Sequence, residues 1–456
     1  MHNSRKFMGT DPISSLLIKF SVPAIIGMVI NALYNVVDRM FIGNAPDLGA
    51  NGLAGITIGF PIMILQMSIG QLFGVGGATL FSMRLGRGDK KGATLALNTA
   101  LVLSASSGIV FMILGHFLLN QILTWFGASP TVLPFSAAYM RVIFFGSVFQ
   151  TVGMTLNNFL RADGQPKLAM ITMMFGAGTN ILLDPIFIYG LNMGMKGAAL
   201  ATILSQMTSM VWTLFYFLNR DNPHHIRLDH FKFQWHEVGQ IVYLGTPIFM
   251  TQIGNSILNL VLNKTLYHYG GDMAVSGMGI INSVNTLLIM PILGINQGVQ
   301  PIVSYNFGAK KYRRIIETEK LAMTAATLFI STGWFISRFF PDLIISMFSN
   351  NPALIAFTAP RLFRWQLVLP LVGFQILGAN FFQAIGQSRK ALFLTLSRQI
   401  IFLLPAIVLF SRFWGIEGLF YAAPFADTSA IVVTAITFYF GIKHLLDLEK
   451  EEEILV

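Results

Sequence analysis

Two carboxylates lie inside long apolar stretches of the chain, where charged side chains are rare because they cost several kcal/mol to insert into a membrane. Asp38 lies in the stretch 16–42, and Asp184 lies in 168–190, one helical turn after Asn180. Thr202 follows near the start of the next stretch. If these stretches are membrane-spanning helices, a rise of about 1.5 Å per residue puts the four side chains at similar depth. Two carboxylates, an amide and a hydroxyl could bind Na⁺ or share one proton.

A structural role is the alternative for both acids. Asp38 could pair with the adjacent Arg39, and Asp184 could cap a kink at Pro185. Adjacent residues on a helix point about 100° apart, so Arg39 need not neutralise Asp38. The matched depth of polar side chains on three stretches therefore favours a site that couples transport to a cation.

The second half of the chain carries other polar residues at depth. Arg398 and Asp427 lie at similar depth on consecutive stretches, which predicts an ion pair between them or, alternatively, contact with a substrate. Amides in both halves could add polar contacts to a substrate cavity, although hydrogen bonds between helices are the commoner role of such groups. The candidates for that cavity are Asn31, Asn35, Asn157, Asn255, Asn259, Gln300, Arg398 and Asp427.

The composition requires a bilayer around most of the chain. Hydrophobic residues make up 54% of the 456 positions and charged residues only 11%, against about 25% in soluble domains. The chain has no cysteine, which excludes disulfides and thiolate metal sites. We therefore predict an all-α integral membrane protein with twelve transmembrane helices, at 16–42, 55–81, 94–118, 134–160, 168–190, 197–218, 239–268, 275–305, 317–340, 355–383, 391–412 and 417–442.

Basic residues concentrate in alternate connections between these helices. Examples are Arg84 and Arg87 after the second helix and Lys310 and Lys311 after the eighth, whereas 43–54, 119–133 and 269–274 contain none. This bias predicts a multi-pass protein of the plasma (bacterial inner) membrane with both termini in the cytoplasm. It also accounts for the net charge of +10 without nucleic-acid binding.

The two halves repeat each other at an offset of 222–224 residues. The segment 158–167 matches 380–389 with five of ten positions identical, and Pro23 matches Pro247. Each repeat holds six helices, so the halves have the same orientation and are expected to be related by a pseudo-twofold axis, with a cavity between them. We predict an N-terminal lobe at 1–218, a cytoplasmic linker at 219–238, and a C-terminal lobe at 239–456 that ends in a short acidic tail.

These motifs resemble the multidrug and toxic compound extrusion (MATE) family over essentially the whole chain. The resemblance rests on Pro23 with Tyr34–Asp38, on Arg84–Asp89, Arg161–Pro166 and Asn180–Pro185, and on Gln297–Pro301 with Tyr305–Gly308. It implies two six-helix bundles that export cationic, lipophilic drugs or dyes against an inward flow of H⁺ or Na⁺, and hence a role in antibiotic resistance. In one branch of the family the cation binds to an Asp, Asn, Asp, Thr set, which carries over to Asp38, Asn180, Asp184 and Thr202.

A flippase for lipid-linked oligosaccharides is the alternative function, since it has a related fold. Anionic lipids would require several basic side chains in the cavity, of which Arg398, Arg361 and Arg364 are the candidates. No pattern of catalytic residues at membrane depth indicates an enzyme. We expect no cofactor beyond the coupling ion, a monomer, and drugs and the lipid bilayer as partners.

Overall fold

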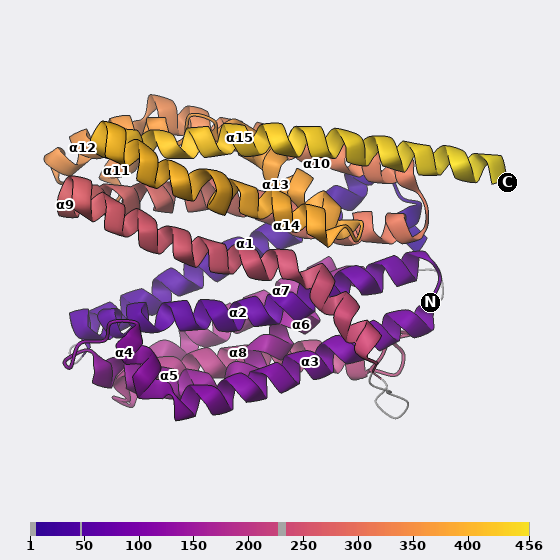
Figure 1. Cartoon of the computed structure of the whole chain (residues 1–456). Coiled ribbons are helices and arrows are strands. Elements are labelled where there is room, and N and C mark those ends of the chain that lie inside the picture. The colour runs from indigo at the N-terminus through magenta and orange to yellow at the C-terminus, as the bar shows by residue number, and fades with distance from the viewer. Residues whose placement is uncertain (1–5, 46–47, 227–233, 456) are drawn as a thin grey trace. The chain divides into compact units, whose positions relative to one another are not determined.

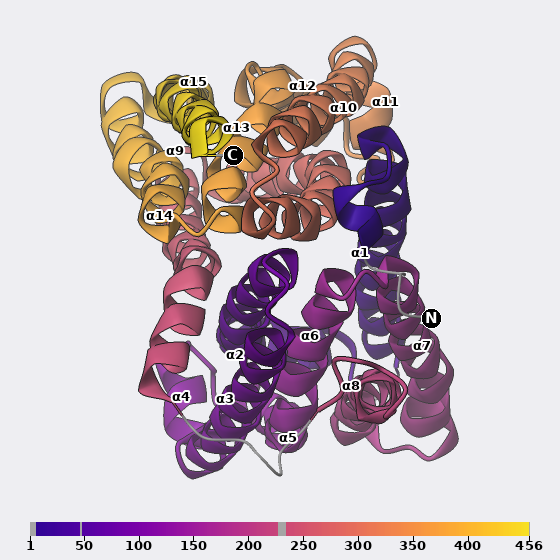
Figure 2. The same cartoon turned by 90° about the vertical axis from the view of Figure 1, so that its right-hand side faces the viewer.

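The computed structural model describes residues 6–45, 48–226 and 234–455, which form helices and no strand. Within each of the two compact units described below, the main helices run along one shared direction (Figures 1 and 2). The elements in chain order are η1 (Lys6–Gly9), α1 (Ile13–Asn44), α2 (Gly49–Gly86), α3 (Lys90–Phe117), α4 (Leu119–Trp125), α5 (Leu133–Phe145), α6 (Ser147–Ala162), α7 (Pro166–Pro185), η2 (Ile186–Gly190), α8 (Gly194–Leu218), α9 (Trp235–Gly308), α10 (Tyr312–Phe339), α11 (Pro341–Ser346), α12 (Pro352–Trp365), α13 (Leu369–Ala384), α14 (Ser388–Leu396), η3 (Ser397–Leu403) and α15 (Leu404–Leu455).

The predicted membrane-spanning segments fall within these helices. In the described part of the chain, seven helices are long and apolar enough to cross a membrane, or nine if each bent pair counts as one span. The bent pairs are α5 with α6, at 54°, and α12 with α13, at 48°. They lie at equivalent places in the two repeats. The prediction of an all-α membrane protein is confirmed.

Two glycines divide the longest helices into two spans each. Gly271 interrupts α9 at φ 60° and ψ −158°, and Gly415 interrupts α15 at φ 60° and ψ −145°. A side chain disfavours this backbone conformation, so glycine is the residue that lets the chain reverse direction here. Together with α10, which carries charges at both ends, these breaks account for the predicted total of twelve spans.

The compact units differ from the predicted lobes at two helices. The first unit consists mainly of Ile26–Phe249, and the second contains Gly9–Ile25 with Met250–Val456. The start of α1 therefore packs with the second unit, and the start of α9 packs with the first. Helices α1 and α9 run through the boundaries of the units, between Ile25 and Ile26 and between Phe249 and Met250, because helix hydrogen bonds continue wherever no turn residue interrupts them. We call these bodies unit 1 and unit 2.

The predicted linker 219–238 stays a prediction. Its residues 227–233 lie outside the described part of the chain, and α9 already begins at Trp235. The predicted acidic tail is helical. It continues α15, where Glu449 pairs with Arg313 at 2.9 Å and Glu452 pairs with Lys310 at 2.7 Å.

The backbone at Gly271 yields a stability prediction. Gly271→Ala should lower the free energy of unfolding by roughly 1–3 kcal/mol, because a residue with a side chain strains the backbone at this positive φ. Steric overlap does not contribute, since no atom lies within 4 Å of the added Cβ. Gly279→Ala is the matched control, since Gly279 lies in the same helix, also has open space and lacks the positive φ. Thermal unfolding in detergent measures both variants. Equal midpoints for the two would show that the break at Gly271 carries no strain.

Candidate functional site

The four predicted coupling residues all lie in unit 1 and are all buried. Asp38 comes from α1, Asn180 and Asp184 come from α7, and Thr202 comes from α8. The exposed fractions are 8% for Asp38, 0% for Asn180 and Asp184, and 5% for Thr202. Asp184 is followed by Pro185, which donates no backbone hydrogen bond, and the helix widens into the π-turn η2 directly after it.

The structure brings the two carboxylates together. The side chains of Asp38 and Asp184 lie close enough for the charge of each to act on the other. Thr202 takes part through Tyr139, whose hydroxyl lies within hydrogen-bond reach of the threonine side chain. Thr202 Oγ1 also bonds to the carbonyl of Ala198 at 3.0 Å.

Several polar atoms of this group have no hydrogen-bond partner among the described residues. They are Asp38 Oδ1, both carboxylate oxygens of Asp184, and both amide atoms of Asn180. Buried polar groups in proteins are normally satisfied, so such a set indicates bound water, a proton or an ion. The oxygens and their burial fit a proton or a small hard cation.

The structural alternatives for the two acids do not agree with these contacts. The guanidinium of Arg39 lies 5.3 Å from the ring centroid of Phe60 and makes no ion pair with Asp38 among the described residues. The oxygens of Asp184 accept no hydrogen bond from the described backbone, so Asp184 does not cap the bend at Pro185. Among the described residues, neither acid makes the ion pair or the cap of its structural alternative, although the charge of Arg39 still acts on Asp38.

Tyr34 and Tyr139 belong to the site but were not predicted. Tyr34 lies one helical turn before Asp38, close enough to interact with its charge. Tyr139 is 1% exposed and lies near both carboxylates as well as Thr202. The i, i+4 spacing could have suggested Tyr34. No pattern in the sequence distinguishes Tyr139 from other aromatic residues of its helix.

The ion pair predicted in the second half is confirmed. Arg398 Nε donates to Asp427 Oδ1 at 2.7 Å, linking η3 to α15, and the aspartate side chain is 5% exposed. Each charge is thus compensated within unit 2. A role for this pair in binding substrate stays a prediction.

The remaining cavity candidates make mainly local hydrogen bonds. Asn35 donates to the carbonyl of Asn31 at 2.6 Å, and Asn259 donates to that of Asn255 at 2.9 Å. Asn157 donates to the carbonyl of Ala169 at 3.0 Å and accepts from Arg161. Asn255 accepts from Gln399 at 2.8 Å. Gln300 is half-buried. Asn31, Asn35 and Asn259 are exposed on their own units, which leaves their side chains accessible to a ligand.

Unit 2 also contains a buried acid that the sequence analysis overlooked. Glu319 in α10 is 1% exposed, and its Oε2 has no hydrogen-bond partner in the described chain. It lies near the start of the predicted span 317–340, next to Lys320. Burial alone distinguishes it from the exposed Glu317 two residues earlier.

Comparison with known proteins identifies the family. The model of the MatE family matches residues 23–186 and 247–408, one match in each repeat. The chain belongs to the MatE family. Multidrug export protein MepA of Staphylococcus saprophyticus is 27% identical over 443 residues, covering 96% of this chain and 95% of that protein. MepA of Staphylococcus aureus (strain MRSA252) is 26% identical over 430 residues, or 94% of each chain.

Solved structures of this family share the fold along nearly the whole chain. The crystal structure of a MATE protein in the bent conformation has a TM-score of 0.92 at 24% identity and covers 98% of both chains. An outward-facing multidrug resistance MATE family transporter of the MOP superfamily has a TM-score of 0.91 at 25% identity, covering 98% of this chain and 99% of that one. This MatE-family chain is therefore a multi-pass membrane protein of the multidrug efflux transporter family.

The Arg398–Asp427 pair yields a prediction on stability. Asp427→Asn should lower the free energy of unfolding by roughly 3 kcal/mol, because it leaves the Arg398 charge uncompensated. Adding Arg398→Gln should restore part of that loss, since no charge then remains unpaired. Thermal unfolding of the two single variants and the double variant measures the coupling. Strictly additive losses would show that the pair contributes nothing as a unit.

Proposed function

We propose that this transporter exports cationic or lipophilic small molecules by alternating access, driven by inward H⁺ or Na⁺ flow through Asp38, Asn180, Asp184 and Thr202. The observation that supports the site is the pair of buried carboxylates, of which three oxygens have no hydrogen-bond partner among the described residues. A single cation bound between Asp38 and Asp184 would compensate their charge. Without it, two like charges would face each other away from water, which is unfavourable.

The energy of cation binding would act on the helices that carry the acids. Asp184 immediately precedes the proline and π-turn of α7, and Asp38 lies on α1, which contains Pro23. Proline removes a helix hydrogen bond and allows bending. Binding of the cation in the outward-facing state would favour one bend of these helices and, with it, release of the substrate.

The proposed substrate class is supported by the relatives and by the composition. The staphylococcal relatives are named multidrug export proteins. The chain has 40 Phe and 23 Met, and those that line a cavity would form an adaptable apolar wall for flat lipophilic compounds. We further propose that the protein works as a monomer in the plasma membrane with both termini in the cytoplasm.

The contacts of the basic residues argue against the flippase alternative. Arg361 and Arg364 both donate to Glu417, and Arg398 donates to Asp427. The arginines that were candidates to hold an anionic lipid are thus bound to carboxylates within unit 2. This arrangement favours a transporter of neutral or cationic compounds.

The coupling site is tested by removing one charge at a time. Asp38→Asn and Asp184→Asn proteins should bind dye with near-normal affinity but lose gradient-driven efflux by about 100-fold, because the cation no longer has two carboxylates to bridge. Glu319→Gln is the control, since it removes a buried acid from the other unit and should keep the coupling. Transport into inverted vesicles and equilibrium dye binding are measured in parallel. Near-normal efflux by either aspartate variant would place the coupling cation elsewhere, with Glu319 as the next candidate.

The coupling ion is tested by imposing Na⁺ and pH gradients separately on vesicles that contain the wild-type protein. A proton-coupled transporter should accumulate dye under a pH gradient in the absence of Na⁺. A sodium-coupled one should require Na⁺ at constant pH. Dye accumulation without either gradient would contradict coupled transport altogether.

A further inference from the structure

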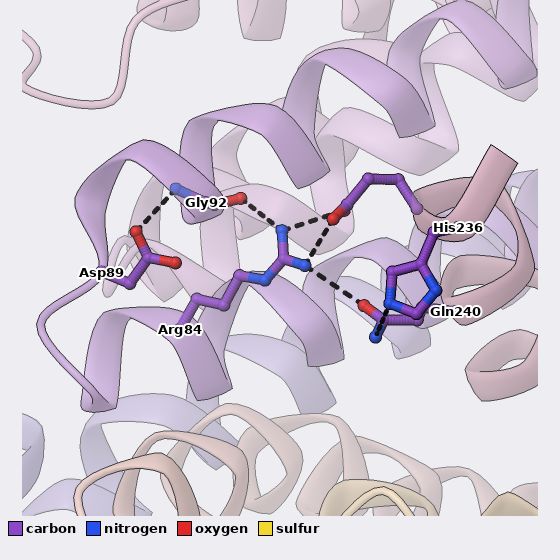
Figure 3. A network of polar contacts seen from close by, with 6 residues as sticks. Arg84, Asp89, Gly92, His236 and Gln240 are labelled. Carbon is purple, nitrogen blue, oxygen red and sulfur yellow. Dashed lines mark hydrogen bonds and ion pairs between the residues drawn. The ribbon is translucent and has the colours of Figure 1, made fainter. Parts of the chain in front are cut away.

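The end of α2 and the start of α9 are joined by a guanidinium bound to a buried carboxylate (Figure 3). Arg84 Nη2 donates to Glu237 Oε1 at 2.6 Å, and Nη1 donates to Glu237 Oε2 at 2.9 Å. Arg84 also donates to the carbonyl of Gly92 at 2.8 Å and to Gln240 Oε1 at 3.1 Å. Glu237 is only 4% exposed, and two parallel hydrogen bonds to arginine are the strongest geometry for such a pair.

The acid nearest to Arg84 in sequence is engaged elsewhere. Asp89 accepts from the backbone N–H of Gly92 at 2.8 Å and thereby caps α3 (Figure 3). The carboxylate that compensates Arg84 comes instead from a residue 153 positions later in the chain. The ion pair thus acts between two helices rather than within the loop that contains Arg84.

Glycine contacts hold the same two helices together further along. A side chain at Gly76 would overlap the carbonyl oxygen of Ile241, and a side chain at Gly245 would overlap that of Leu72. The backbones of α2 and of the start of α9 are therefore in direct contact, which only the absence of side chains permits. Residues 235–249 are fixed to unit 1 at both ends of this contact.

Unit 2 contains the equivalent arrangement in the second repeat. A Cβ on Gly298, which corresponds to Gly76, would lie 2.7 Å from the backbone nitrogen of Ser21, which corresponds to Gly245. The start of α1 thus packs on the second repeat as the start of α9 packs on the first. Here Arg314 donates to the carbonyl of Asp11 at 2.6 Å, so a guanidinium again holds the incoming segment.

We propose that Arg84 and Glu237 form a permanent anchor that keeps residues 235–249 on unit 1 throughout transport, so that α9 bends just beyond Pro247. The boundary between the units falls between Phe249 and Met250, two residues after that proline. Proline weakens the helix there, whereas the segment before it is bound by the ion pair and by backbone contact. Arg84 and Glu237 are positioning residues, and this inference rests on the proposed transport function.

A covalent replacement of the ion pair tests whether the anchor must stay closed. The natural chain has no cysteine, so Arg84→Cys with Glu237→Cys introduces the only two thiols. With free thiols, dye transport should fall at least about fivefold, because the start of α9 is no longer held. Linking the thiols with a short bifunctional methanethiosulfonate should restore transport to within about twofold of wild type. Arg87→Ala, which changes an exposed neighbouring arginine, is the control and should transport normally.

Two transport results would overturn the proposal. Normal transport by the unlinked double variant would show that transport does not require the Arg84–Glu237 ion pair. Transport that is lost on linking and regained on reduction would show that the segment must detach during the cycle, so that the pair is a gate rather than an anchor.

Hydrogen–deuterium exchange tests the anchor without relying on transport. Residues 235–249 should exchange slowly in the wild-type protein with or without dye, and faster in Glu237→Gln, while the start of α10 stays unchanged. Unaltered exchange in Glu237→Gln, or faster exchange on adding dye to the wild type, would overturn the anchor. If the wild-type protein moves no dye, the transport proposal fails, and exchange alone decides on the anchor.

Discussion

Two carboxylates buried next to each other in an apolar bundle require a positive charge between them. In water their repulsion would be screened, but inside a membrane protein the charges interact strongly and lose their hydration. Asp38 and Asp184 are in this position, and the guanidinium of Arg39, the residue after Asp38, lies 5.3 Å from the ring centroid of Phe60. In the proposed transport cycle, the energy released when a cation binds between the two acids would change the shape of unit 1. A coupled transporter needs such a source of energy.

The two units have the same architecture but differ in how their buried charges are compensated. In unit 2, Arg398 is paired with Asp427, and Glu417 accepts from two arginines. These charges are compensated by protein and have no need of an ion. Glu319 differs, because one of its oxygens is buried without a partner among the described residues. The helices of the two repeats are therefore alike, while their ionisable side chains differ, and the pair of adjacent buried acids lies in unit 1.

Small residues allow the start of each repeat's first helix to pack on the unit that contains most of the other repeat. Lipid removes most of the hydrophobic driving force between helices, so close backbone approach and polar contacts take its place. Gly76 and Gly245 in one unit, and Gly298 with Ser21 in the other, permit that approach at equivalent positions. Each unit can therefore hold the start of the other repeat's first helix, although the chain continues from it into a different body.

Features that depend on neighbouring residues can be predicted from the sequence. Apolar length defines each span, the bias of basic loops indicates which ends lie together, and a regular offset exposes the repeat. The polar set in unit 1 could also be predicted, because depth along a helix follows directly from residue number. Contacts between groups that are distant in sequence become visible only in the folded chain. Tyr139 at Thr202, Glu237 at Arg84, and the assignment of residues 9–25 to unit 2 depend on the rotation and packing of helices that are far apart in sequence. Hydropathy does not record these contacts, since it measures how much of a helix is apolar and not which face meets which neighbour.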